Sequence, residues 1–548
     1  MSNSTSVLSM SEAVEEVDAV VVGAGFAGIY MLYKLRELGL SAKGFEAGSD
    51  VGGTWYWNCY PGARCDMQSI EYCYSFSPEV SQEWTWSDRF ASHSQIQGYL
   101  KFVADRLDLR RYITFNARVK SMVYDDAKNR WTVRTDSNEA VTARLCITAA
   151  GCISIPVRPN IPGLDKYSAG PVYHTGRWPH EPVDFTGKRV GIVGTGSTAM
   201  QLVPELAKQA AELYVFQRTP THAIPANNFR FSDTYSKRIK QRYEQLWKKW
   251  VASPSAASFN TSSKSVLDVT EEERDSTFES AWNIGGFEIL FSFEDLLVDK
   301  AANDIAADFC RKKIKQIVKD QTVAEQLLPG DHPLGSKRIC LSHGYYEAFN
   351  LPNVHLVSAQ VEPIVEIEQK GVRTSKELYQ IDSLILATGF DTMTGSLLAM
   401  DVRGRGGVSL REEWAKGAAT YLGLGMAGFP NLFTLTGPGS PTVLTNMPRC
   451  VEQHVDWVGK CISYMSTHHI ATIEPTTEAQ TAWMNLVTSI AEQTLFSKGK
   501  SWYNGDNIEG KPRQFLPFVG FGYYQTLIDK VANENYEGYI MRPETAPA

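Results

Sequence analysis

The sequence predicts an α/β fold with two nested parallel sheets and a helical insertion, on three observations. An apolar run at 18–22 ends in a glycine turn, followed by a helical pattern and a second short strand that ends at Glu46. The same strand–turn–helix–strand order begins again at Arg189. Between 225 and 333 the apolar spacing becomes that of helices. Two such units in one chain indicate two Rossmann-like dinucleotide-binding domains, one inserted in the other.

Length and composition are those of a multidomain globular protein. At 548 residues, 43% hydrophobic and 21% charged, the chain is too long for a single core. Its net charge of −7 argues against a general affinity for nucleic acid or anionic membranes. No secretory pattern or bilayer-spanning apolar stretch is visible, and the nine cysteines form no regular framework. We expect a cytoplasmic protein whose partners include neither nucleic acid nor membrane.

An FAD site is predicted by the first glycine motif, Gly23-Ala24-Gly25-Phe26-Ala27-Gly28. The motif follows a strand and opens a helix, whose N-terminus favours the negative charge of a pyrophosphate. Gly23 permits the tight turn, Gly25 lets the backbone approach the phosphates, and Gly28 lets helix and strand pack closely. Glu46 ends the next strand, where a ribose hydroxyl needs an acceptor. A chance glycine turn, the alternative, would not explain this context.

The chain carries a second motif, Gly194-Thr195-Gly196-Ser197-Thr198-Ala199, with alanine as the third small residue. The strand after it ends at Arg218 and Thr219 instead of an acid. A carboxylate there would repel a 2′-phosphate, whereas Arg218 can hold one through paired hydrogen bonds. The contrast between Glu46 and Arg218 predicts FAD in the first domain and NADPH in the second. The alternative for Arg218 is an ordinary surface cation.

Two longer segments carry a family resemblance. They are Gly52-Gly53-Thr54-Trp55-Tyr56-Trp57-Asn58-Cys59-Tyr60-Pro61-Gly62-Ala63-Arg64-Cys65-Asp66 and Gly170-Pro171-Val172-Tyr173-His174-Thr175-Gly176-Arg177-Trp178-Pro179. They resemble the two signatures of type I Baeyer–Villiger monooxygenases, and with the nucleotide motifs the likeness covers nearly the whole chain. One departure is visible: the leading aromatic of the second signature falls on Ser168, beside Tyr167, which we interpret as local repacking.

The resemblance implies roles for individual residues. Arg338 matches the catalytic arginine of the family, Lys337 the lysine that helps to hold the NADPH phosphate, and Asp66 the acid near that arginine and the flavin. Trp502 matches a tryptophan on a mobile loop that contacts the nicotinamide and closes the pocket, and 437–447 matches a loop lining the substrate cavity. The remaining cofactor-binding positions implied are Gly53, Thr54, Trp55, Tyr72, Val119, Thr388, Gly389 and Met447.

The implied reaction converts a ketone and O2 to an ester or lactone. NADPH reduces the flavin, O2 gives a C4a-peroxyflavin, and this anion attacks the ketone to form a tetrahedral (Criegee) adduct. A guanidinium suits both anionic stages because it stays charged and cannot act as an acid. Asp66 is a sensible counterion for a buried Arg338. The alternative is that the two residues form structural ion pairs elsewhere.

Three other functions compete with this one. A disulfide reductase would need two cysteines with four residues between them, directly after the glycine pair. Here the first of those positions is Trp55, and Cys59 and Cys65 have five residues between them. The same flavin chemistry could oxygenate sulfur or nitrogen, as in the related flavin-containing monooxygenases. A flavin- and NADPH-binding sensor without turnover is the third. No metal site is predicted, since the ten histidines form no ligand cluster.

We expect five segments along the chain. The FAD-binding domain comprises 1–151 and 390–548, with a mobile loop near 500–513, and the NADPH-binding domain comprises 152–224 and 335–389. The helical insertion occupies 225–334. The partners implied are a ketone and O2. No oligomer interface can be identified from the sequence, so the oligomeric state stays open and includes a monomer.

Overall fold

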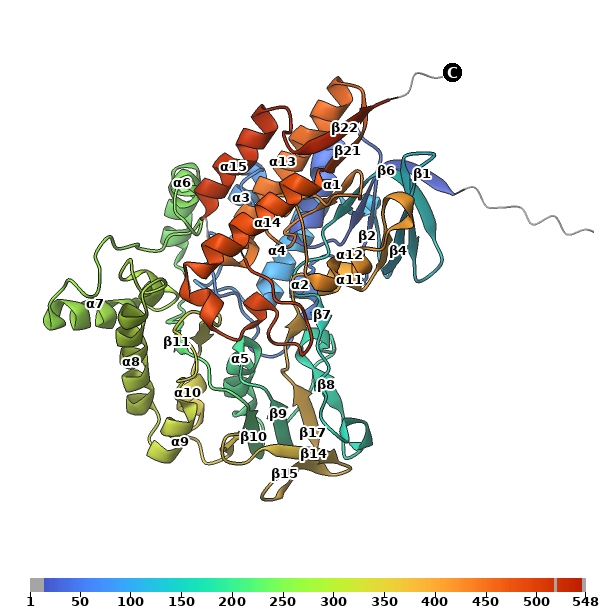
Figure 1. Cartoon of the computed structure of the whole chain (residues 1–548). Helices are drawn as coiled ribbons and strands as arrows, with labels where there is room; N and C mark the ends of the chain where they lie inside the picture. Colours follow the sequence, from blue (N-terminus) through green and yellow to red (C-terminus); the bar gives the residue numbers. More distant parts are fainter. Residues whose placement is uncertain (1–13, 517–519, 545–548) are drawn as a thin grey trace, which may run out of the picture.

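The computed structural model describes residues 14–516 and 520–544 and contains two sheets with strong parallel character (Figure 1). The first sheet lies in the upper half of Figure 1 and the second in the lower half. The helices α6 to α9 lie to the left of both. The predicted fold class, two nested Rossmann-like units with a helical insertion, is confirmed.

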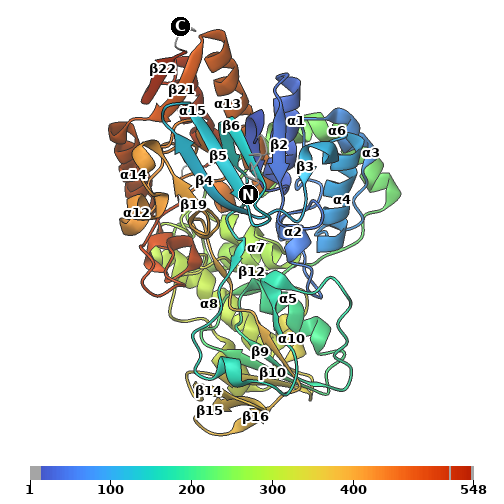
Figure 2. The ribbon, with the colours of Figure 1, turned by 90° about the vertical axis from the view of Figure 1, so that its right-hand side faces the viewer.

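The first sheet has the order β19-β4-β5-β6-β1-β2-β3, with β20 paired to β6. Strands β3, β2, β1, β6 and β20 are mutually parallel, whereas β4, β5 and β6 form the antiparallel meander seen in Figure 2. The bounds are β1 Glu15–Val22, β2 Ala42–Phe45, β3 Ile113–Thr114, β4 Val119–Asp125, β5 Arg130–Thr135, β6 Ala140–Thr148, β19 Asp401–Arg403 and β20 Leu432–Thr434. Because β19 and β20 come from the second half of the chain, both halves build this sheet.

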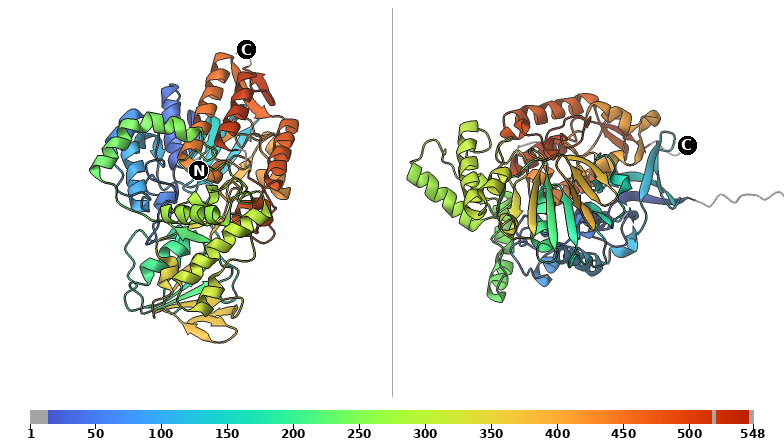
Figure 3. Two further views of the ribbon diagram at one scale, coloured as in Figure 1. Left: turned by 90° about the vertical axis from the view of Figure 1, so that its left-hand side faces the viewer. Right: turned by 90° about the horizontal axis from the view of Figure 1, so that it is seen from below.

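The second sheet is wholly parallel, with the order β13-β10-β9-β17-β8. Figure 3 (right) looks onto it from below. Its strands are β8 Val172–His174, β9 Arg189–Val193, β10 Glu212–Gln217, β13 Val354–Ser358 and β17 Ser383–Leu386. Four of these five strands are fully or mostly buried, which suits a sheet covered on both faces. All of them come from the middle of the chain, so the second unit is inserted in the first.

Helices cover both sheets and the space between them. Helix α1 packs against α13, which also contacts α15. Among the described helices none is long and apolar enough to cross a membrane. The bounds are α1 Phe26–Glu37, α2 Thr54–Trp57, α3 Pro78–Glu83, α4 His93–Arg106, α5 Ser197–Leu206, α6 Asp233–Val251, α7 Glu271–Ile284, α8 Lys300–Ile317, α9 Gln321–Leu327, α10 Tyr345–Ala348, α11 Gly395–Leu398, α12 Leu410–Glu413, α13 Met447–Thr467, α14 Thr477–Glu492 and α15 Phe521–Asn533. The remaining strands are β7 Ile155–Pro156, β11 Ala223–Pro225, β12 Cys340–Ser342, β14 Ile364–Glu368, β15 Gly371–Thr374, β16 Leu378–Gln380, β18 Phe390–Asp391, β21 Ile470–Pro475 and β22 Tyr539–Pro543.

The helical insertion joins the two hydrophobic cores. Tyr243 and Trp250 of α6 and Phe278 of α7 belong to the core of the first unit. Ile314 of α8 and Leu327 of α9 belong to the core of the second. The insertion therefore interrupts the second unit in sequence but packs against both in space. This arrangement fixes the two sheets relative to one another.

We predict that Asn431→Ala destabilises the first unit. The buried Asn431 amide donates to the carbonyls of Arg144 and Ala471 at 3.1 and 2.9 Å, and its oxygen accepts from Ile473 N at 2.8 Å. Truncation leaves these backbone groups buried without partners, so the free energy of unfolding should fall by about 3 kcal/mol. Urea unfolding followed by circular dichroism measures the change.

The control is Asn138→Ala. Asn138 also has a left-handed φ, +62° against +57° for Asn431, but it is exposed. The two variants therefore share the backbone strain and differ in the buried hydrogen bonds. Equal destabilisation by both would contradict this account.

Candidate active site

Bare backbone lines the turn of the first glycine motif. Gly23 has φ +104°, and a Cβ there would lie 2.5 Å from the Ala149 carbonyl oxygen. A Cβ on Gly28 would lie 1.8 Å from the carbonyl oxygen of Gly23. Gly53 approaches Gly25 so closely that a Cβ on Gly53 would lie 2.9 Å from the Gly25 Cα. Two glycine segments thus meet at the N-terminus of α1, which fits the pyrophosphate of a dinucleotide.

Glu46 lies where the prediction requires a ribose acceptor. Its carboxylate is buried and accepts from Ala24 N and Gly48 N, each at 2.7 Å. Burial raises the pKa of Glu46, and these N–H donors partly offset the rise. Each carboxylate oxygen keeps acceptor capacity beyond its single N–H donor. The side chain can therefore also accept hydrogen bonds from ribose hydroxyls.

Four further predicted FAD residues surround this turn or the sheet beside it. Trp55 and Tyr72 are buried, and Trp55 Nε1 donates to Tyr72 Oη at 3.3 Å with the rings edge to face. Thr54 is the first residue of α2, directly after Gly53. Val119 is the buried first residue of β4. Trp55 and Tyr72 therefore form an aromatic wall that follows the glycine contact in sequence and space.

The second glycine motif repeats the turn in the second sheet. Gly194 has φ +111°, and a Cβ there would lie 2.4 Å from the Ala387 carbonyl oxygen. Thr195 Oγ1 donates to the Thr219 carbonyl at 3.1 Å, which ties this turn to the end of β10. Residues 197 and 198 form the first turn of α5. This helix N-terminus is free of acidic side chains and suits an anion.

Two cations converge near the end of β10. Arg218 is exposed, and Lys337 is largely covered, with its Nζ 3.7 Å from Asp331 Oδ2. Burial lowers the pKa of Lys337; Asp331 opposes that shift, and the charge of Arg218 adds to it. The two like charges therefore repel across a shared space. A phosphate dianion placed between them would relieve this repulsion.

Arg338 and Asp66 meet, although 272 positions separate them in the chain. Arg338 Nε donates to Asp66 Oδ2 at 2.7 Å. Nη1 donates to the Val443 carbonyl at 3.1 Å and to Tyr503 Oη at 3.5 Å. The guanidinium carbon lies 5.3 Å from the centre of the Phe287 ring. Burial alone would lower the pKa of Arg338, but Asp66 above all holds it well above its usual range, so the side chain stays charged.

An apolar cluster lies beside this pair. Trp502 and Met447, both predicted site residues, belong to it. The Trp502 ring lies 4.3 Å from that of Tyr503, and its carbonyl accepts from Thr392 Oγ1 at 2.9 Å. The other members of the cluster are Cys152, Ile153, Leu297, Met393, Val443, Leu444, Phe496 and Leu516. A charged pair thus lies next to a cluster of mostly apolar side chains.

The two segments that link the sheets are joined through His174. Its Nδ1 accepts from Gly176 N at 3.0 Å, so Nε2 carries the proton and donates to the Val157 carbonyl at 3.2 Å. Thr388 Oγ1 donates to the same carbonyl at 2.6 Å, and the Gly389 carbonyl accepts from Val157 N at 2.9 Å. Burial lowers the pKa of His174, which keeps it neutral. His174 therefore has a structural role, since its hydrogen bonds hold the two linkers together.

The departure at Ser168 is a local repacking. Ser168 is exposed, whereas the preceding Tyr167 is buried in the core beside β17. The Tyr167 hydroxyl donates to the Ile381 carbonyl at 3.1 Å. The aromatic ring of the signature has moved by one position and still packs inside.

Neither cysteine of the 59–65 segment belongs to a redox pair. All nine cysteines are free thiols. The Cys59 thiol contacts the Trp178 carbonyl at 3.5 Å, and Cys65 is buried. Burial raises the pKa of both thiols. Both therefore behave as packing residues and not as reactive thiolates.

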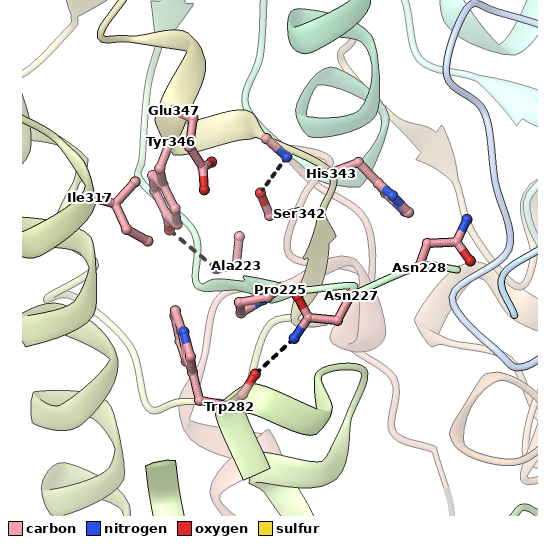
Figure 4. Close-up of a pocket in the computed structure, with 11 residues that line it drawn as sticks. Ala223, Pro225, Asn227, Asn228, Trp282, Ile317, Ser342, His343, Tyr346 and Glu347 are labelled. Carbon is pink, nitrogen blue, oxygen red and sulfur yellow. Dashed lines mark hydrogen bonds between the residues drawn. The ribbon is translucent and has the colours of Figure 1, made fainter. Parts of the chain in front are cut away.

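A separate cavity of about 260 Å³ opens between the insertion and the second unit (Figure 4). Trp282 and Tyr346 line one side of it, and Asn227 and His343 the other. Burial lowers the pKa of His343 to about 4, so its ring is neutral at physiological pH. None of the predicted site residues lines this cavity, and we assign it no part in the chemistry.

Three contacts of Arg338 were not predicted from the sequence. Tyr503 directly follows Trp502, and Val443 lies within the 437–447 loop, but neither position indicates a contact with Arg338. Phe287 follows a glycine pair in the insertion, and no sequence signal indicates its position. These contacts depend on how distant segments pack, which residue spacing does not reveal.

Comparisons with known proteins agree with this geometry. A family model described as pyridine nucleotide-disulphide oxidoreductase matches residues 20–285. A phenazine N-monooxygenase of Lysobacter antibioticus is 43% identical over 96% of this chain and 97% of its own. A Baeyer–Villiger monooxygenase of Pseudooceanicola batsensis is 42% identical over 97% of each chain. The solved structure of an oxidized steroid monooxygenase bound to NADP is 46% identical, covers 96% of this chain and all of its own, and has a TM-score of 0.92.

We predict that Arg218→Ala weakens the binding of NADP⁺ selectively. Loss of a charged hydrogen bond to the 2′-phosphate should raise the dissociation constant of NADP⁺ by about 10- to 100-fold. NAD⁺, which lacks that phosphate, should bind as it does to the unaltered protein. Isothermal titration calorimetry with both nucleotides measures the difference. The control is Arg242→Ala, at an exposed position on α6; an equal loss of NAD⁺ affinity in Arg218→Ala would contradict the assignment.

Proposed function

The chain belongs to the Baeyer–Villiger monooxygenases, and we propose that Arg338 and Asp66 carry its reaction. Relatives named as cyclohexanone, cyclopentanone and acetone monooxygenases, and a solved relative in complex with FAD and NADP, support an NADPH- and FAD-dependent conversion of ketones with O2 to esters or lactones. The observation that carries the proposal is the 2.7 Å contact between Arg338 Nε and Asp66 Oδ2 beside an apolar cluster. A fixed positive charge next to apolar side chains suits a reaction in which oxygen becomes anionic.

The two cofactors would be held by different sheets. We propose that the turn at 23–28, Glu46 and the Trp55–Tyr72 wall hold FAD. The turn at 194–199, with Arg218 and Lys337, would hold NADPH. Bound FAD supplies the redox chemistry, since it accepts hydride from NADPH and activates O2. The residues present fit both groups. Glycine backbone at a helix N-terminus can bind a pyrophosphate, and the two cations can bind a 2′-phosphate.

Arg338 would act through charge and not through proton transfer. Negative charge builds up on oxygen when a ketone carbonyl is attacked, and a guanidinium within reach stabilises that charge. Its pKa lies well above the usual range, so it does not protonate and quench the attacking oxygen. A lysine here could lose its proton on burial, because desolvation disfavours the charged form. Arginine is therefore better suited to the position.

Asp66 would hold Arg338 in place. A carboxylate at 2.7 Å from Nε offsets the cost of burying the guanidinium. It occupies Nε and leaves the far edge of the guanidinium for other partners. We propose that this far edge faces the reacting oxygen. Val443, whose carbonyl binds Nη1 at 3.1 Å, would hold the same edge against the substrate loop.

Trp502 and its apolar neighbours would keep water from the reacting centre. The loop that carries Trp502 is held by the Thr392 hydroxyl and by Lys511, whose Nζ lies 2.6 Å from Asp391 Oδ1. Bulk water in the site would weaken the interaction of Arg338 with any anion and would supply protons. Closure of this loop is therefore expected to precede oxygen insertion.

The direct test of the proposed function is a substrate screen. Cyclic, aryl and long-chain ketones are supplied with NADPH and O2, and esters or lactones are detected by mass. We expect NADPH consumption that depends on the ketone, with one oxygen atom added to the product. NADPH consumption without any oxygenated product would contradict the proposal, and the absence of any ketone-dependent NADPH consumption would favour a sensor.

We predict that Arg338→Ala separates the two half-reactions. Flavin reduction by NADPH should persist, because hydride transfer needs no cation at this position. Ester formation should fall to background, because the developing negative charge loses its partner. Anaerobic stopped-flow absorbance measures the first step, and product mass the second.

Arg106→Ala is the control for Arg338→Ala. Arg106 pairs with Glu83 in an exposed position, so the variant should behave like the unaltered enzyme. Ester formation by Arg338→Ala at a near-normal rate would exclude this assignment. Loss of FAD from the variant, checked by its absorbance, would show that folding and not chemistry had failed.

A second candidate function is N-oxygenation of an aromatic heterocycle. The specific observation in its favour is the 43% identity to a phenazine N-monooxygenase. We expect ketones to be converted with the higher kcat/KM, because the charged Arg338 suits attack on a carbonyl. Assaying phenazines and ketones under the same conditions distinguishes N-oxygenation from ester formation. Faster N-oxide formation than ester formation from every ketone tested would favour the second candidate.

A further inference from the structure

A phenol from the 495–514 segment reaches Arg338. Tyr503 lies in the 3-10 turn Trp502–Asn504 and is 5% exposed. Its hydroxyl oxygen accepts a hydrogen bond from Arg338 Nη1 at 3.5 Å. Burial raises the pKa of the Tyr503 phenol, and Arg338 opposes the rise, so the hydroxyl is neutral at physiological pH. The contact therefore joins a neutral acceptor to a permanent cation.

The geometry of the guanidinium shows what this contact adds. Asp66 binds Nε, close to the pivot of the planar group, and so leaves the far edge free to swing. The swing is opposed at Nη1 by two acceptors, the Val443 carbonyl and the Tyr503 hydroxyl. These acceptors come from two different segments. Removing one of them leaves Nη1 with a single hydrogen-bond acceptor among the residues that the structure describes.

Contacts other than the one with Arg338 also hold Tyr503 in position. Asn504 Nδ2 donates to the carbonyls of Phe496 and Gly499 at 3.0 and 2.9 Å, which closes the turn on itself. Tyr503 N donates to Ser501 Oγ at 3.0 Å. With the Thr392 and Lys511 contacts described above, the segment holds the phenol from both sides. The hydroxyl therefore reaches Arg338 only when this segment is in place.

We infer that Tyr503 is a positioning residue, which orients Arg338 for oxygen insertion when the 495–514 segment closes. The inference rests on the proposed function, in which Arg338 stabilises negative charge on oxygen. It links closure of the segment to the orientation of the cation. Flavin reduction, which does not use that charge, is independent of the link.

The test is Tyr503→Phe, which keeps the ring beside Trp502 and removes the hydroxyl. Anaerobic reduction by NADPH should change by less than about twofold, while ester formed per NADPH falls by about tenfold, the loss expected for one hydrogen bond to a charged group. Hydrogen peroxide should account for the difference. The KM for the ketone should stay constant, because Tyr503 acts through Arg338 and not on the ground-state substrate.

Tyr345→Phe is the matched control. Tyr345 is 1% exposed, and its hydroxyl has no hydrogen-bond partner within the described parts of the chain. It therefore loses the same atom from an equally buried site that is not in contact with Arg338. The control should couple NADPH consumption to ester formation as the unaltered enzyme does.

A second readout does not depend on turnover. Deuterium uptake by the 495–514 segment is measured with NADP⁺ bound. Tyr503→Phe and Arg338→Ala should each raise the uptake, and the double variant should raise it no further than the larger single change. Such non-additivity is expected when two residues act through one contact.

Two results would overturn the inference: unchanged coupling in Tyr503→Phe, or additive changes in deuterium uptake. Failure of the proposed function has a different signature. In that case the unaltered enzyme forms no oxygenated product from any ketone, while the uptake measurements still report on the Tyr503–Arg338 contact.

Discussion

A buried guanidinium is costly, and the arrangement of this protein follows from holding one in place. Isolated in a medium of low dielectric constant, a charge of this size loses several kcal/mol of hydration (about 5 or more). Asp66 offsets that cost, with its oxygen 2.7 Å from Nε. The Val443 carbonyl and the Phe287 ring add weaker partners. Each of these groups comes from a different part of the chain, so the charge is stable only when all the parts are assembled.

The nested topology is what brings these parts together. Arg338 precedes β12, near the end of the insertion, whereas Asp66 follows the first glycine turn and Val443 lies close before α13. The first sheet recruits β19 and β20 from the second half of the chain, which places Val443 beside the early segment. The insertion packs against both cores and brings Phe287 to the junction. His174 holds together the linkers between the sheets. Its presence in the second family signature is therefore explained by these hydrogen bonds and needs no role in proton transfer.

The sequence predicted what local chemistry encodes. The glycine turns, Glu46 and Arg218 follow from backbone sterics and charge at strand ends, and the structure places each at the expected turn. Helix α6 begins at Asp233, with Ser232 as its cap, inside the region where the apolar spacing predicts helices. The contacts of Tyr503 and Phe287 with Arg338 could not be predicted from the sequence. They arise from a loop and from an insertion whose packing leaves no periodic pattern in the sequence. The shift of an aromatic ring from 168 to Tyr167 was expected as repacking, but the Ile381 carbonyl that receives its hydroxyl was not.

In the proposed function, the apolar cluster beside Arg338 would also set the strength of the interaction between its charge and an anion. Two unit charges about 4 Å apart interact by ~1 kcal/mol in water and by ~4 kcal/mol at the effective dielectric constant near a protein surface. Covering the site with Trp502 and Met447 therefore raises the effect of the same guanidinium severalfold without changing it. The Trp502 part of this cover comes from the segment that also carries Tyr503. In the proposed mechanism, exclusion of water and orientation of the charge would therefore both depend on closure of one segment.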